Sequence, residues 1–220
     1  MMLSNVEKIS SALGERFFTM QLCFNLLKGF RGKQILQVGC EDRDFGYDNA
    51  DLFKLFSDLV NECKDIKYNI ICKEEKDKRL YEINSLIYKN NNRHNINIIK
   101  EEDYTKEKID LLVLHDIDYP IDELTKQVSQ DLNYIEAKNL LNGIDQSEFD
   151  HHYGHLVNKS RERVLQDYKT FSRRLSSKAI VLLEGNDYPG GSQTLLAKRQ
   201  LEREGFICLL DLKQSVWIRR

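Results

Sequence analysis

The segment QILQVGCEDRDFG, residues Gln34–Gly46, decides the fold class. A short, largely apolar run, Ile35–Val38, ends abruptly at Gly39, and polar residues follow before a helical pattern over Asn49–Cys63. A buried parallel strand has this form, and a glycine at its carboxyl end lets the backbone approach a ligand. In open α/β sheets the ligand lies at that edge, where each strand turns into its helix. We therefore look for functional residues at the ends of the strands that follow.

Length and composition indicate one soluble globular domain over residues 1–220, with 41% hydrophobic residues and a net charge of −2. The absence of a basic excess argues against a nucleic-acid partner. Five cysteines without a CxxC motif indicate reduced thiols and a cytoplasmic protein. The N-terminus lacks an apolar signal core, and no stretch approaches the roughly 18 apolar residues of a membrane span, so we expect no membrane association.

From Gln34 onward, strand patterns alternate with helical ones, which predicts an α/β fold with a doubly wound, Rossmann-like, mostly parallel sheet. The last two strands are separated only by Leu-Lys-Gln, so the final strand is expected to run antiparallel. A helical segment over 1–32, with an apolar face at Phe17–Phe30, precedes the sheet and is a candidate surface for a homodimer. Seven strands are expected, at Gln34–Val38, Tyr68–Cys72, Asn97–Lys100, Asp110–Leu114, Ala179–Leu183, Phe206–Asp211 and Ser215–Ile218.

A long polar insertion over 120–177 separates the fourth and fifth strands, where a crossover needs only about a dozen residues. Its pattern is helical, and long insertions at a ligand-binding edge commonly serve as lids or substrate walls. It contains His151, His152 and His155. On one continuous helix, His151 and His155 would share a face. They are candidate catalytic bases or parts of a substrate wall, and the alternative is ordinary surface histidines.

The order of these stretches resembles the class I S-adenosylmethionine-dependent methyltransferase superfamily. It is most similar to the family-24 and macrocin O-methyltransferase group. That resemblance implies an acidic residue at the end of strand two, an Asp after strand three, a D-x-D stretch after strand four and an acidic pair after strand five. The matching stretches are LQVGC (36–40), ICKEE (71–75), IIKEEDY (98–104), LHDIDYP (114–120), LLEGNDYPGG (182–191) and FICLLDLKQSVWIR (206–219).

Two positions depart from the family pattern. Gln37 stands where an acidic residue is usual, and Gly39 is followed by no further glycine until Gly46. The acidic pair after strand five is Glu184-Gly185, with one carboxylate absent.

Several residues are candidates for binding S-adenosylmethionine. Gly39, Cys40 and Glu41 form the loop after strand one, which can pass beneath the methionine part of the cofactor or be a plain turn. A carboxylate such as Glu74 can accept hydrogen bonds from the ribose hydroxyls, or it is a solvated residue at a helix start. The resemblance places an adenine contact at Asp103, and Tyr104 is a candidate to cover the ring face. His115 is also a candidate for binding the cofactor, because it ends strand four, at the edge to which the transferred methyl group should point.

The end of strand four supplies the catalytic candidates His115 and Asp116. An imidazole suits the task of removing a proton from an acceptor hydroxyl, because its unperturbed pKa is near 6.5. Asp116, Asp118 and Glu184 are candidates for Mg²⁺, which prefers oxygen ligands. The alternative is that His115 packs in the core and Asp118 begins a turn. After strand five, Ser192 is expected to be the N-cap of a helix over Gln193–Glu204.

The leading hypothesis is an S-adenosylmethionine-dependent methyltransferase acting on a small-molecule or glycan-like acceptor, with oxygen as the methylated atom. A second is a catalytically inactive binding or scaffold protein with the same fold. A third is a nucleotide-sugar enzyme, because Asp116-Ile117-Asp118 matches the D-x-D metal motif of many glycosyltransferases.

Overall fold

The computed structural model describes residues 34–39, 63–73, 95–104, 107–115, 119–128, 134–185, 187–188, 191–211 and 214–220, and the isolated positions 22, 25, 56–57 and 59–61. The expected helix at Phe17–Phe30 lies outside these residues except at two positions. Described positions between Phe56 and Asn61 are helical, in agreement with the helix predicted there.

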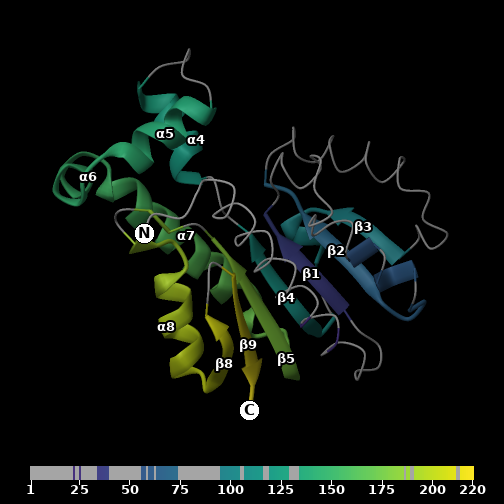
Figure 1. Cartoon of the computed structure of the whole chain (residues 1–220). Coiled ribbons are helices and arrows are strands. Elements are labelled where there is room, and N and C mark those ends of the chain that lie inside the picture. Colours follow the sequence, from purple (N-terminus) through teal and green to yellow (C-terminus); the bar gives the residue numbers. More distant parts are fainter. Residues whose placement is uncertain are drawn as a thin grey trace.

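Seven strands form one sheet in the order β3-β2-β1-β4-β5-β9-β8 (Figure 1). The strand β9 is antiparallel to both of its neighbours, and the other pairings are parallel, so β9 is the one antiparallel strand of the sheet. The predicted fold class is therefore confirmed. The strands are β1 (Gln34–Val38), β2 (Lys67–Ile71), β3 (Ile96–Ile99), β4 (Ile109–His115), β5 (Leu175–Glu184), β8 (Phe206–Asp211) and β9 (Gln214–Arg219).

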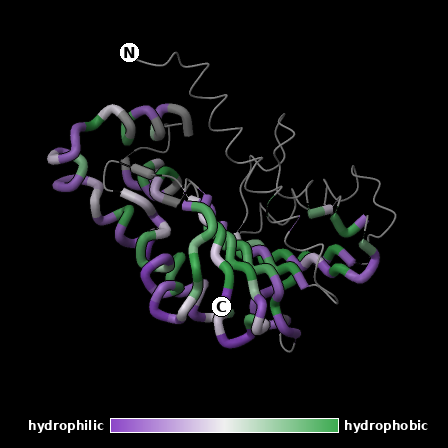
Figure 2. Tube along the Cα trace, turned by 60° about the horizontal axis from the view of Figure 1, so that its bottom comes forward, coloured by the Kyte–Doolittle hydropathy of each residue, from purple (hydrophilic) through white to green (hydrophobic). Residues whose placement is uncertain are grey.

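Alternate residues of these strands enter two separate cores, one on each face of the sheet. Ile35, Leu111, Ile180 and Val216 face a core that includes the helical residue Phe56. Leu36, Leu112, Val181 and Trp217 face the other core, beneath α7 (Gly154–Ser172) and α8 (Leu195–Arg203). Figure 2 shows the strands as the most hydrophobic part of the described chain. Burial on both faces explains why these strands read as continuous apolar runs.

Four helices follow β4, and the first three stand beyond the sheet (Figure 1). They are α4 (Tyr119–Val128), α5 (Tyr134–Gly143) and α6 (Gln146–His152), here called the helical layer. A third hydrophobic core holds the helical layer together, with Phe149 fully buried in it. Asp145 caps α6 by accepting hydrogen bonds from the amides of Ser147 and Glu148, and these bonds lower the pKa of its carboxyl group. In the described part of the chain, no helix has the length and apolar content needed to cross a membrane.

The helix α7 belongs to two cores at once. Leu156 and Val157 in its first turns are buried in the core of the helical layer, whereas Val164, Tyr168 and Phe171 are buried against the sheet. The second half of α7 is thus the ordinary crossover helix between β4 and β5. Among the residues that the structure describes within the predicted 120–177 insertion, the helical layer and the start of α7 are what is added to this crossover.

A small hairpin, β6 (Asp187–Tyr188) and β7 (Gly191–Ser192), follows β5 and was not predicted. Gly191, at its turn, has a φ of +86°. The predicted role of Ser192 as N-cap is wrong, because Ser192 lies in β7 and the N-cap of α8 is Thr194. The hairpin occupies the residues that were expected to lead directly into the helix.

Gly39 brings the carboxyl ends of three strands together. Its amide donates to the carbonyl of Ile71 at the end of β2, at 3.0 Å. Its φ is +90°, and a Cβ atom added there would lie 1.8 Å from the carbonyl oxygen of His115 at the end of β4. Only glycine fits, because a side chain would require both a left-handed backbone and a severe clash.

We expect Gly39→Ala to lower the free energy of unfolding by about 3 kcal/mol or more, since strain and overpacking act together. Chemical denaturation followed by circular dichroism measures the loss. Gly205→Ala separates the two causes, because Gly205 has a φ of +80° with no atom within 4 Å of the added Cβ. Gly143→Ala, with open space and no positive φ, is the neutral control. Equal losses for Gly39→Ala and Gly205→Ala would refute the close approach to His115.

Phe149→Ala should remove about 3–5 kcal/mol of packing energy from the core of the helical layer. Because that core is separate from the two on the sheet, hydrogen exchange should accelerate in α4–α6 and remain slow in β1 and β4. Val164→Ala, in the half of α7 that packs on the sheet, is the matched control and should accelerate exchange in β4. Equal acceleration in both regions after Phe149→Ala would show that the helical layer and the sheet unfold as one unit.

Candidate active site

Polar side chains from four neighbouring strands are buried on one face of the sheet at its carboxyl edge. His115 ends β4, Glu184 ends β5, and Gln214 begins the antiparallel β9. Gln37 lies in β1, two residues before Gly39. All four positions are on the face whose remaining residues form the core around Phe56. A row of buried polar groups directly above an apolar core has to be hydrogen-bonded to be stable.

His115 and Glu184 form the central pair of this row. Their Cα atoms are register partners across β4 and β5, and His115 Nδ1 lies 2.8 Å from Glu184 Oε2. The two side chains are each 1% exposed. An ionised Glu184 carboxylate would accept from the Nδ1–H of His115, which would leave Nε2 of a neutral ring as the basic nitrogen.

Gln214 holds the other oxygen of Glu184. Its Nε2 donates to Glu184 Oε1 at 3.2 Å, and the two residues are register partners across β5 and β9. Gln214 was not among the predicted site residues. Gln214 is identified by the register between β5 and β9, which places the first residue of β9 opposite the last residue of β5.

Gln37 serves the loop after β1 rather than a ligand. Its Oε1 accepts from the hydroxyl of Tyr68 at 2.5 Å, and its Nε2 donates to the carbonyl of Gly39 at 3.1 Å. An acidic residue at this position has no N–H to give to that carbonyl. The departure from the family pattern therefore fixes the backbone of Gly39.

The structure argues against Glu184 as a metal ligand. Both of its oxygens are engaged by His115 and Gln214. At Gly185, where the resemblance implies a second carboxylate, there is no side chain, and an added Cβ would lie 3.0 Å from Thr194 Cγ2. Among the residues that the structure describes, no three His, Cys, Asp or Glu side chains are placed to hold a metal ion. The residues present do not fit the predicted Mg²⁺ site at Glu184.

Asp103 and Tyr104 follow β3 but point to different environments. Asp103 lies exposed in a short 3-10 helix, Glu101–Asp103, where its carboxylate can accept from a ligand. Tyr104 is 5% exposed and packs edge-on against Phe171, with the guanidinium of Arg174 above its ring. Its ring belongs to the core beneath α7, so the prediction that it covers an adenine is wrong.

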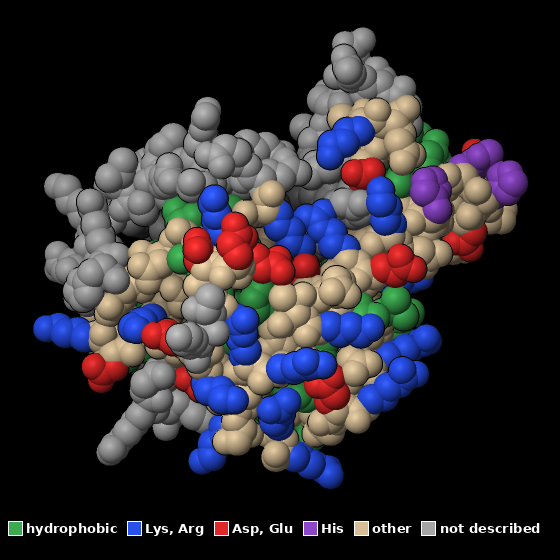
Figure 3. Space-filling model, turned by 180° about the vertical axis from the view of Figure 1, so that it is seen from behind, with side chains coloured by type: hydrophobic (Ala, Val, Ile, Leu, Met, Phe, Trp, Pro, Cys, Tyr) green, Lys and Arg blue, Asp and Glu red, His purple; other side chains and the backbone are tan. Residues whose placement is uncertain are grey.

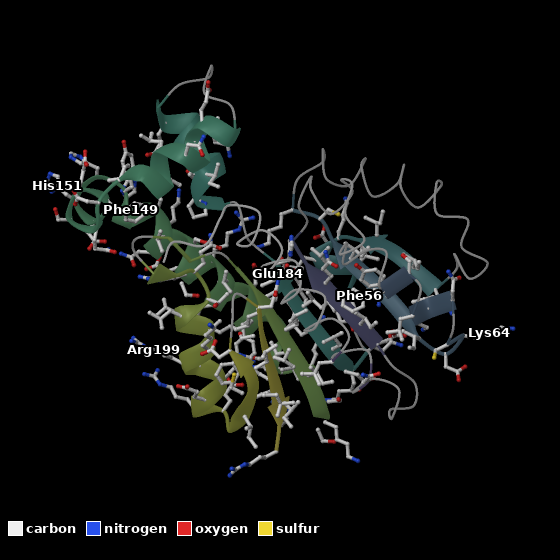
Figure 4. The ribbon with its side chains drawn as sticks, in the orientation of Figure 1. Phe56, Lys64, Phe149, His151, Glu184 and Arg199 are labelled. Atoms are coloured by element: carbon white, nitrogen blue, oxygen red, sulfur yellow. The ribbon has the colours of Figure 1, made fainter. Side chains whose placement is uncertain are left out.

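His151 and His155 do not share one helix, which corrects the basis of their prediction. The helix α6 ends at His152, and α7 begins at Gly154. Both side chains are exposed. Figure 3 shows the histidines gathered at the outer end of the helical layer, and Figure 4 shows His151 far from Glu184. Surface histidines are the interpretation that this arrangement favours.

The structure brings Gly39 and His115 into contact and leaves Asp103 at the same edge of the sheet, after β3. The remaining predicted site residues lie outside the described part of the chain, and their assignments stay predictions. They are Cys40, Glu41, Glu74, Asp116 and Asp118.

By sequence, no protein-family profile and no curated protein matches the chain. Among solved structures, it is similar to a proposed caffeoyl-CoA O-methyltransferase from Staphylococcus aureus, with a TM-score of 0.51 and 10% identity over 99% of this chain and 93% of that one.

Two further solved structures have lower TM-scores. Magnesium protoporphyrin IX methyltransferase from Synechocystis, solved with bound S-adenosylmethionine, gives 0.48 at 10% identity over 100% of this chain and 86% of that one. A proposed O-methyltransferase from Nostoc punctiforme gives 0.44 at 12% identity, covering 91% of this chain but only 55% of the longer protein. The strand order and the Staphylococcus aureus structure together show that the chain has the class I S-adenosylmethionine-dependent methyltransferase fold.

The buried Tyr104 phenol makes a prediction about alkaline pH. Burial, together with the negative charge of Glu107, raises its pKa to about 12. In the unfolded chain the phenol ionises near pH 10, so the unfolded state binds fewer protons above that pH and the free energy of unfolding falls. The stabilisation is complete below pH 10 and is lost as pH rises toward 12. Tyr104→Phe should reduce this fall by on the order of 2–3 kcal/mol.

Urea denaturation of both proteins at several pH values between 9 and 12 measures this difference. Tyr168→Phe is a second variant with the same expected direction, because burial and a hydrogen bond to Glu204 raise the pKa of Tyr168. An identical alkaline slope in the wild type and Tyr104→Phe would contradict the burial of this ring.

Proposed function

We propose that this protein is an S-adenosylmethionine-dependent methyltransferase that methylates a hydroxyl group of a small-molecule or glycan-like acceptor without a metal ion. The observation that carries the proposal is the His115–Glu184 pair at the carboxyl edge of a sheet with the methyltransferase strand order. In doubly wound sheets this edge is where ligands bind. A histidine whose Nδ1 is held by a carboxylate there is arranged to act as a base.

Two features of the described edge are compatible with the cofactor. The backbone at Gly39 turns sharply over the ends of β2 and β4 and places no side chain at that point. Asp103 leaves an exposed carboxylate after β3, and exposed oxygens of this kind can accept hydrogen bonds from an adenine amine. The fit extends, as predictions, to Glu74 for the ribose and to Cys40 and Glu41 beneath the methionine part.

When bound, S-adenosylmethionine supplies an electrophilic methyl group on a sulfonium, and the acceptor oxygen forms a bond to its carbon as the carbon–sulfur bond breaks and the electron pair stays on sulfur. The protein has to align the two molecules, which alone can lower a barrier by roughly 7–11 kcal/mol. It also has to remove the hydroxyl proton, a task worth on the order of 10²–10⁴ in rate. We assign proton removal to His115 Nε2.

The second candidate is a binding protein that keeps the methyltransferase fold without catalysis. Gln37 and Gly185 favour it, because each replaces a family carboxylate and each is built into the packing. Gln37 is hydrogen-bonded to Gly39 and Tyr68, and Gly185 lies against Thr194. No described feature favours the nucleotide-sugar enzyme, whose Asp116 and Asp118 lie outside the described residues.

Binding of S-adenosylhomocysteine, the reaction product, is the first test. A ligand that binds only the folded state raises stability by about 2.7 kcal/mol at one hundred times its dissociation constant, so a thermal shift should be evident. EDTA should leave the shift unchanged, because the proposal uses no metal. Glu74→Ala and Asp103→Asn should each reduce the shift, whereas Lys64→Ala, on a turn before β2, should not.

Isothermal titration calorimetry of the wild type and the three variants measures their affinity for S-adenosylhomocysteine. No binding at millimolar S-adenosylhomocysteine would contradict the methyltransferase proposal. A shift with a uridine diphosphate sugar and Mn²⁺ in its place would favour the nucleotide-sugar alternative.

A further inference from the structure

We infer that Glu184, held in place by Gln214, is a positioning residue that fixes the tautomer and orientation of His115 for metal-independent proton removal. This inference rests on the proposed function and goes beyond it, because it assigns roles to two residues on neighbouring strands. Figure 4 shows Glu184 in the middle of the sheet region, at the end of its strand.

The strand register accounts for this arrangement. His115 pairs with Glu184 between the parallel strands β4 and β5, and Glu184 pairs with Gln214 between β5 and the antiparallel β9. Directly paired residues project on the same face of a sheet with their Cβ atoms about 4.5–5.5 Å apart. The three side chains therefore form a transverse row whose geometry is set by backbone hydrogen bonds rather than by a flexible loop.

The contacts of Glu184 match a positioning role. The carboxylate is 1% exposed and accepts from His115 Nδ1 at 2.8 Å and from Gln214 Nε2 at 3.2 Å. Removing either hydrogen-bond donor would leave one oxygen of the buried Glu184 carboxylate without that partner, which is strongly destabilising. The stability of the site therefore depends on both contacts. Each oxygen is aimed along the sheet at a neighbouring strand, and a metal ion would have to replace one of these contacts.

The chemical consequence concerns the other ring nitrogen. With the proton held on Nδ1, the lone pair of His115 is on Nε2, which takes the acceptor's hydroxyl proton as the oxygen–methyl bond forms. The resulting imidazolium is stabilised by the Glu184 carboxylate and then returns its extra proton to water. Glu184 keeps its charge throughout, as the carboxylate of a Ser-His-Asp triad does.

Nuclear magnetic resonance of ¹⁵N-histidine-labelled protein without ligand tests the tautomer directly. The full chain near pH 8, where an unperturbed imidazole is neutral, should show His115 protonated at Nδ1. The His115 signals are those missing from His115→Asn. Glu184→Leu should move the proton to Nε2, whereas Glu184→Gln, whose carbonyl can still accept from Nδ1, should retain it. Leu182→Val, two residues earlier on the same face of β5, is the control for a loss of packing without loss of the carboxylate.

The outcomes separate this inference from the proposed function. The positioning role is supported if His115 is protonated on Nδ1 in the wild type, Glu184→Gln and Leu182→Val. It also requires that this protonation is lost in Glu184→Leu. A His115 ring protonated on Nε2 in the wild type overturns the positioning role. This outcome does not depend on whether Glu184→Leu folds. An unchanged tautomer in Glu184→Leu also overturns it. The affinity for S-adenosylhomocysteine, measured on the same proteins, tests the function: its absence would remove the methyltransferase proposal whatever the tautomer of His115.

Discussion

The backbone contact between Gly39 and the carbonyl of His115 is the constraint on which the candidate site depends. An added Cβ at residue 39 would lie 1.8 Å from that oxygen, so the ends of β1 and β4 approach as closely as two polypeptide chains can. The amide of Gly39 donates a hydrogen bond to the carbonyl of Ile71 at the end of β2, and the carbonyl of Gly39 accepts one from Gln37 Nε2. His115 thereby ends β4 where the central strands converge, and its Nδ1 lies 2.8 Å from Glu184 Oε2 at the end of the next strand.

Most of the sheet could be predicted from the sequence, because strands buried on both faces appear as uninterrupted apolar runs. The bounds of β1 and β8 were predicted correctly, and β2 and β3 were displaced by one residue. The strand β5 begins at Leu175, before its predicted start at Ala179. The prediction missed this extension because the intervening residues Ser176–Lys178 are polar and do not continue the apolar run. Apolar runs carry no information about such extensions.

The site was only partly predictable, for a different reason. A residue at the end of a buried strand lies at the ligand-binding edge of the sheet, which is why His115 and Glu184 were identified. Which way a side chain turns after a strand is decided by tertiary contacts. Tyr104 turned into the core beneath α7, and the break between helices at Tyr153 separated His151 from His155. The role of Gln214 required knowledge of the strand register, and a single sequence does not encode that register in a local pattern.

Gly185 has a consequence for which side chains this part of the structure can accept. The methyl group of Thr194 lies 3.0 Å from the position that a Cβ would take at residue 185. Thr194 is itself buried and is the N-cap residue of α8. A side chain at residue 185 therefore has to displace the methyl group of Thr194, and this crowding is expected to be destabilising. A larger residue at position 185 is therefore expected only together with a smaller one at position 194, so the loop after β5 and the start of α8 are constrained as one unit.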